Sequence, residues 1–166
     1  MDKLRIATFV ALLCCACLGG LARGASLMKP DEFVAKASAS GQAEVELGRL
    51  ALQKSHSGDV RAFAQRMVDD HSRIDATLAA LAKSKGLKLA GPGASQRATL
   101  AQLGRLSDAQ FDEAYAARMV KDHDEAVSLF SAAGTLDDPE LAAFARQTLP
   151  VLVEHQEIAH HLRDSH

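Results

Sequence analysis

The stretch Phe63-Ala-Gln-Arg-Met-Val-Asp-Asp-His71 returns later in the chain as Tyr115-Ala-Ala-Arg-Met-Val-Lys-Asp-His123. Both copies keep an aromatic residue, an Arg-Met-Val core and an Asp-His pair at the same spacing. In a helix of about 3.6 residues per turn, the aromatic residue, the methionine and the histidine lie on one face. The internal repeat therefore predicts two helices built to one plan, each with a histidine among its inward-facing residues.

The composition of the chain favours a single all-helical domain. Hydrophobic residues make up 48% of the 166 residues, whereas aromatic residues make up only 4%. Alanine and leucine are abundant, and both lose little conformational freedom when they enter a helix. A chain of this length suits one domain that buries roughly two-thirds of its unfolded surface. We therefore expect the all-α class.

Residues 1–25 have the pattern of a secretion signal. Two basic residues precede an apolar run over residues 6–18, and small residues follow this run. The run is too short to span a bilayer, and the small residues around Ala22 and Gly24 offer two cleavage sites. We expect an exported protein, most simply periplasmic, whose folded domain covers residues 26–166.

The alternative to a cleaved signal is a lipoprotein that is processed at Cys17 and anchored through it. Ala16 is suitably small for such processing, but Cys14 stands where a branched aliphatic residue is usual. All three cysteines of the chain lie in this segment. A domain that is cut after the segment therefore has no thiol for a disulfide, a nucleophile or a metal ligand.

The charge of the chain is nearly balanced, with 19 Lys and Arg residues against 21 Asp and Glu residues. A mildly acidic chain with both signs of charge interspersed has no basic patch of the kind that binds nucleic acid, so we expect no nucleic-acid partner. No segment after the signal is apolar for long enough to cross a membrane. The sequence has no catalytic nucleophile group and no phosphate-binding loop, so whether the protein is an enzyme stays open, as does a protein partner or an oligomer.

Capping and turn residues divide the domain into four long helices. About twenty residues, including a short amphipathic piece over 96–103, join the second helix to the third and can run the length of the molecule. This predicts a ferritin-like four-helix bundle with a long connection between helices two and three. The helices are expected from about Asp31 to Ser55, from a cap at Ser57 or Asp59 to Lys85, from the Ser107-Asp108 cap to Gly134, and from Asp138-Pro139 onward.

Three of the four helices bring a histidine to the centre of their apolar face, and the first helix brings a glutamate. These residues are Glu44, His71, His123 and His155. At about 1.5 Å per residue, all four approach one level of the bundle with a spread on the order of 9 Å. Imidazole and carboxylate ligands in an interior without cysteine suit zinc, iron, manganese or copper. The four residues are therefore the candidate ligands of one divalent metal ion.

The same residues also fit a role in packing alone. A buried neutral histidine that is satisfied by Glu44 or by a water molecule is common in protein cores. Arg66 with Asp70, and Arg118 with Asp122, are spaced as ordinary ion pairs within a helix. The acid before each inward histidine is placed to orient a neighbouring imidazole. The competing interpretation is a metal-free structural or protein-interaction module of the cell envelope.

A second group of polar residues lies near the end of the chain. Glu157, His160, His161 and His166 could hold a metal loosely. A polar terminus that frays is the simpler interpretation of this group.

The duplicated Arg-Met-Val-x-Asp-His, the run Glu44-Val-Glu-Leu-Gly-Arg-Leu-Ala51, and Leu149-Pro150 with His155 resemble domain of unknown function 4142. That bacterial family of exported proteins is often labelled predicted outer membrane protein. The resemblance covers the chain from about Asp31 to Leu162. It implies a ferritin-like fold and export, and it implies no activity.

The chain departs from the pattern of di-iron ferritins. Those proteins place a glutamate three residues before the ligating histidine, so that both side chains lie on one face. Here apolar residues hold the positions three before the inward histidines, namely Val68, Val120 and Leu152. We therefore do not expect a carboxylate-bridged di-iron oxidase.

Overall fold

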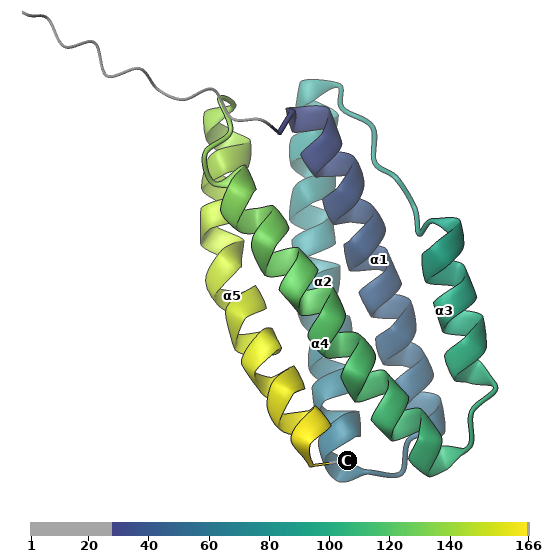
Figure 1. Ribbon diagram of the computed structural model, residues 1–166. Coiled ribbons are helices and arrows are strands. Elements are labelled where there is room, and N and C mark those ends of the chain that lie inside the picture. Colours follow the sequence, from purple (N-terminus) through teal and green to yellow (C-terminus); the bar gives the residue numbers. More distant parts are fainter. Residues whose placement is uncertain (1–27, 166) are drawn as a thin grey trace, which may run out of the picture.

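The computed structural model describes residues 28–165 and places five helices and no strand in this part of the chain (Figure 1). The prediction of an all-α protein is confirmed. The predicted signal over residues 1–25, with its three cysteines, lies outside the described residues. The helices are α1 (Pro30–Lys54), α2 (Gly58–Lys85), α3 (Ala94–Gly104), α4 (Asp108–Ala133) and α5 (Pro139–Asp164).

The predicted capping residues set the helix ends. The Ser57 hydroxyl accepts a hydrogen bond from the backbone N–H of Val60 at the start of α2. Gly86 ends the same helix in the left-handed conformation, with φ of 66°. The Asp138 carboxylate accepts from two backbone N–H groups in the first turn of α5. At its other end α5 continues to Asp164, so the fraying expected from residue 160 onward is not seen.

The four long helices lie side by side as two hairpins. Helix α1 packs against α2 and α4, and α5 packs against α4 and α2, so α1 is diagonal to α5 and α2 is diagonal to α4. The two helices of each diagonal run in the same direction (Figure 1). This follows because the connection after α2 runs back along the molecule before α4 begins. No helix in residues 28–165 has the length and apolarity that a membrane span needs.

The connection between α2 and α4 is more ordered than the sequence predicts. Residues 94–104 form α3, which packs on the outside of α1 and α4. The described chain therefore has five helices where four were expected. Gln96 closes the first turn of α3 by accepting a hydrogen bond from the backbone N–H of Gly93.

The apolar core is divided into two clusters along the bundle. Phe33, Phe130 and Phe144 centre one cluster, and the rings of Phe33 and Phe130 meet edge to face at 5.2 Å. Phe111 and Tyr115 stack at 5.7 Å in the other cluster. On every long helix, the residues that join one cluster are separated from those that join the other by a buried polar residue. Those residues are Glu44, His71, His123 and His155, which therefore form a polar layer in the middle of the bundle.

Candidate metal centre

The structure brings His71 of α2, His123 of α4 and His155 of α5 together in the polar layer. One ring nitrogen of each lies within 4.8 Å of those of the other two. The ring centroids are 5.5 to 5.7 Å apart. The three residues are only 4%, 1% and 0% exposed, respectively. Periodicity within single helices predicts that these side chains face inward near one level, and the packing of the helices decides which of them meet.

Hydrogen bonds on the outer side fix two of the three rings. Nδ1 of His123 lies 2.9 Å from the carbonyl oxygen of Met119 and donates to it, so Nε2 of His123 carries a lone pair. Nε2 of His155 lies 2.8 Å from Oδ2 of Asp70 on α2 and donates to it, so Nδ1 of His155 carries a lone pair. Both rings are therefore held in the tautomer that leaves a lone pair for the interior.

The inner nitrogens have no hydrogen-bond partner. Nε2 of His71, Nε2 of His123 and Nδ1 of His155 are all buried and unpaired. A buried polar group that is left unpaired costs about 1–3 kcal/mol. An ion with the usual zinc–nitrogen distance of about 2.0–2.1 Å holds its nitrogens about 3.3 Å apart. Small ring movements would therefore be enough to bring the three nitrogens onto one ion.

Burial keeps the three imidazoles neutral. It lowers the pKa of His71 well below the ordinary value, and the two neighbouring histidines lower it further. Burial also lowers the pKa of His123, to about 4. The pKa of His155 is lowered by burial too, although its hydrogen bond to Asp70 opposes the shift. All three rings therefore present the neutral form that binds metal ions.

Asp70 is the residue that anchors His155. Its carboxylate also accepts from Nε of Arg66, at 3.3 Å, and from Arg73. Burial on its own would raise the pKa of Asp70, but the hydrogen bonds from His155 and Arg66 bring it below its usual value. Asp70 therefore stays ionised and orients the imidazole of another helix, a role that supports metal ligands in proteins. The sequence indicated the acid but not which histidine it serves.

Glu44 lies in the same layer but outside the group of three converging nitrogens. Its carboxyl faces Asp122, whose Oδ2 accepts from Nε of Arg118 at 2.6 Å. Burial, and then the Asp122 carboxylate, raise the pKa of Glu44 well above its ordinary value and favour its neutral form. Oε2 of Glu44 and the hydroxyl of Tyr115 are both buried without a hydrogen-bond partner. The predicted fourth ligand is thus at the predicted level and turned towards α4.

The internal repeat explains where Glu44 lies. A rotation about the bundle axis that carries α2 onto α4 also carries α5 onto α1, because each pair is diagonal and runs in one direction (Figure 1). The contact of Asp70 with His155 then corresponds to the contact of Asp122 with Glu44. Glu44 is therefore the counterpart of His155. Under this alignment the buried residues Phe33, Val34, Ala37, Gly41, Glu44, Gly48 and Ala51 match the buried residues Phe144, Ala145, Thr148, Leu152, His155, Ala159 and Leu162.

Comparison with known proteins gives a family and a fold. A search of curated proteins finds no match. The crystal structure of a DUF305 fragment from Deinococcus radiodurans is similar, with a TM-score of 0.74 and 17% sequence identity over 83% of this chain and 98% of that chain. At this identity the likeness extends to the fold alone. The sequence matches the family described as Domain of unknown function (DUF4142) over residues 20–162, which confirms the resemblance found in the repeat, and the chain belongs to that family.

Proposed function

We propose that the protein is an exported helical bundle of ferritin-like arrangement that binds one divalent metal ion through His71, His123 and His155. The observation that carries the proposal is that three buried histidines from three helices each bring a ring nitrogen within 4.8 Å of the others, and that each has a buried ring nitrogen without a hydrogen-bond partner. A core without metal leaves all three unpaired at a cost to stability. Coordination would convert that cost into three metal–ligand bonds.

The kind of ligand narrows the choice of ion. Three neutral imidazoles form a site without thiolates, and imidazole suits zinc, copper and iron better than it suits magnesium or calcium. Zinc accepts three protein ligands and a further group in tetrahedral geometry. Zinc and copper are therefore the ions expected to bind most tightly.

Glu44 is the proposed fourth ligand. It is the counterpart of His155 in the internal repeat, so it occupies the fourth corner of the polar layer. Its Oε2 atom is buried and makes no hydrogen bond. Ligation by Glu44 would release the proton that burial keeps on its carboxyl, so uptake of the ion is expected to depend on pH.

Elemental analysis of untagged protein, purified without a chelator, tests the proposal. The wild-type protein is expected to carry a stoichiometric metal ion, and a His71→Ala, His123→Ala double variant is expected to carry none. The matched control replaces His56 and His160 by alanine, because both side chains are at least 41% exposed and neither reaches the layer. Clean apo-protein whose melting temperature does not respond to zinc, copper or iron would favour the metal-free structural module instead.

Export is a separate part of the proposal, and it is supported by the signal pattern of residues 1–25. Fractionation of bacteria that express the full chain is expected to place the protein in the periplasm. A Cys17→Ser variant separates the two modes of export. Release from membranes on this change would indicate the lipoprotein, and an unchanged periplasmic protein would indicate a cleaved signal.

A further inference from the structure

The three histidines are closed off from solvent, so an ion that binds them needs a route. This inference rests on the proposed function. Entry to a closed site requires a local opening, and the opening that disturbs the fewest packed side chains is the least costly. The cavities beside the polar layer show where such an opening is available.

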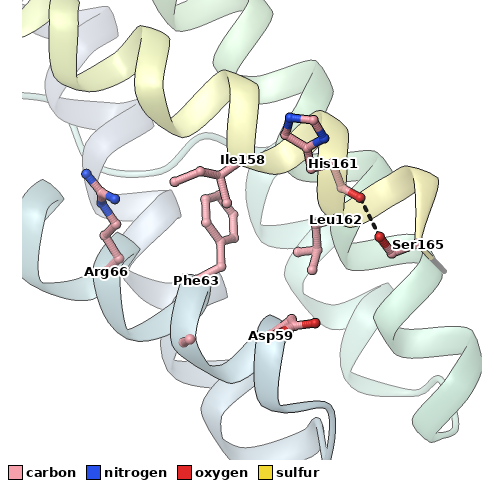
Figure 2. A pocket seen from close by; sticks show the side chains of 8 residues that line it. Asp59, Phe63, Arg66, Ile158, His161, Leu162 and Ser165 are labelled. Carbon is pink, nitrogen blue, oxygen red and sulfur yellow. Dashed lines mark hydrogen bonds between the residues drawn. The ribbon is translucent and has the colours of Figure 1, made fainter.

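One cavity lies between the first half of α2 and the last turns of α5, and Phe63 is the lining residue that contacts the histidines (Figure 2). Its volume is about 490 Å³. Phe63 of α2 and Ile158 of α5 both line it and belong to one apolar cluster (Figure 2). Asp59, Arg66, His161 and Ser165 also line it and supply polar groups. The cavity thus combines apolar side chains with an imidazole, a carboxylate and the guanidinium of Arg66, which is paired with Asp70 and Glu154.

Phe63 separates this cavity from the histidines. Its ring centroid lies 6.3 Å from that of His123 and 6.4 Å from that of His155, against which it packs edge to face. Phe63 also lines the cavity and is 3% exposed. The side chain therefore has the proposed ligands on one side and a solvent-connected space on the other. A rotation of one aromatic ring would join the two.

The opposite side of the layer is closed more firmly. A cavity of about 950 Å³ beside α1, α3 and α4 reaches Asp122. Asp122 is paired there with Arg118 at 2.6 Å, and the carboxyl of Glu44 faces it. A cation that entered on this side would have to break a largely buried ion pair, which costs more than the displacement of an apolar ring.

We propose that the cavity between α2 and α5 is the loading route of the protein: a hydrated divalent cation enters the space that Asp59 and His161 line, and Phe63 moves aside to pass it to the three histidines. Asp59 supplies negative charge to this space, and His161 supplies the same ligand type as the final site. Phe63 controls the rate of exchange and contributes no ligand.

Stopped-flow absorption with Co²⁺ as the probe tests this route on the full chain. A Phe63→Leu variant is expected to exchange the ion about tenfold faster in both directions, with a Kd that changes by less than about twofold. The matched control is Phe111→Leu, because Phe111 is fully buried in the same apolar cluster but does not line the cavity. This control accounts for any general loosening of the core.

A second pair of variants tests the polar lining of the cavity. His161→Ala is expected to slow association and dissociation several-fold by the same factor, because His161 lines the route and does not contact the ion in the final site, so the Kd is unchanged. His160→Ala is the control, because the neighbouring residue lies near Asp124 on α4, with 3.7 Å between Nε2 and Oδ1, and does not line the cavity. In the first test, leucine in place of Phe63 keeps most of the core filled, so the Phe63→Leu variant is expected to fold.

Three results would overturn the route. They are unchanged rates in Phe63→Leu, a change in Kd without faster association, and faster loading in Arg118→Gln, which would place entry on the opposite side. Each of these leaves metal binding intact. Failure of the proposed function gives a different result, because the wild-type protein would then show no Co²⁺ spectrum at all.

Discussion

The two copies of the repeat have nearly the same sequence, but their aspartates contact different chemical groups on the neighbouring helices. Arg66 with Asp70, and Arg118 with Asp122, form the same ion pair within a helix, at 3.3 and 2.6 Å. Asp70 then accepts from an imidazole of α5, whereas Asp122 meets a carboxyl of α1. The local motif therefore fixes the position of each aspartate, and the residue on the neighbouring helix decides what the aspartate does.

The aromatic residues of the two copies, Phe63 and Tyr115, also have different surroundings. Phe63 lines the cavity between α2 and α5, and it has no polar atom to satisfy. Tyr115, its counterpart on α4, is fully buried, and its hydroxyl lies unpaired in the region of Glu44. One face of the layer thus places an imidazole against its paired aspartate beside an apolar ring, and the other face places a carboxyl against its paired aspartate beside a tyrosine. The predictions below test whether this division governs metal binding and stability.

The largest expected effect is stabilisation by the metal. Zinc at about a thousandfold above its Kd is expected to raise the free energy of unfolding by about 4 kcal/mol, because the ion binds the folded chain alone. His123→Ala should abolish this gain, whereas His56→Ala should keep it, because its side chain is 85% exposed in the wild type. Chemical denaturation with and without zinc measures the difference. An equal gain in both variants would show that the ion binds elsewhere.

Acid should destabilise the metal-free protein, because the three buried histidines take up protons more readily in the unfolded chain than in the folded one. The folded pKa of His123 is about 4, below the ordinary 6.5, so the unfolded chain takes up a proton first as the pH falls. Stability is therefore fully present above about pH 6.5 and is lost towards pH 4, by roughly 3 kcal/mol from His123 alone. His71 and His155, whose pKa values are also lowered, add to this loss.

Denaturant melts of the apo-protein at several pH values measure this effect. His123→Gln should reduce the dependence on pH, because glutamine does not titrate. His56→Gln, which changes an exposed residue, should leave the dependence as it is in the wild type. A stability that stays flat between about pH 7.5 and 5.5 would contradict the burial of neutral histidines.

The same change at the two aspartates compares the two faces directly. Asp70→Asn should weaken metal binding about 10–100-fold, because the carboxylate that orients His155 is lost. Asp122→Asn should weaken it less, since the contacts of Asp122 are with Arg118 and Glu44. Titration with Co²⁺ in the presence of a competing chelator gives both affinities. Equal losses in the two variants would mean that the faces are equivalent in supporting the ion.

Sequence reasoning reached most of the fold because the signals are local. Ser57, Gly86 and Asp138 cap helices through groups within a few residues, and the 3.6-residue period turns the histidines inward. The order of α3 was missed because that helix depends on packing against α1 and α4. The direction of Glu44 was missed for a related reason. Its partner lies on another helix, and the spacing along α1 contains no information about it.

The smallest expected effect comes from a change that makes the two faces alike. Glu44→His would place an imidazole opposite Asp122, as His155 lies opposite Asp70. The new ring can donate to Asp122, and the change removes a carboxyl that burial disfavours in its charged form. The two side chains are similar in size, so stability should stay within about 1.5 kcal/mol of the wild type, while binding of copper should strengthen relative to manganese. Denaturation and competitive metal titration measure both quantities. A loss of more than about 4 kcal/mol would show that the α1 side cannot accept the partner that the α5 side uses, and that the internal symmetry does not extend to the chemistry of the layer.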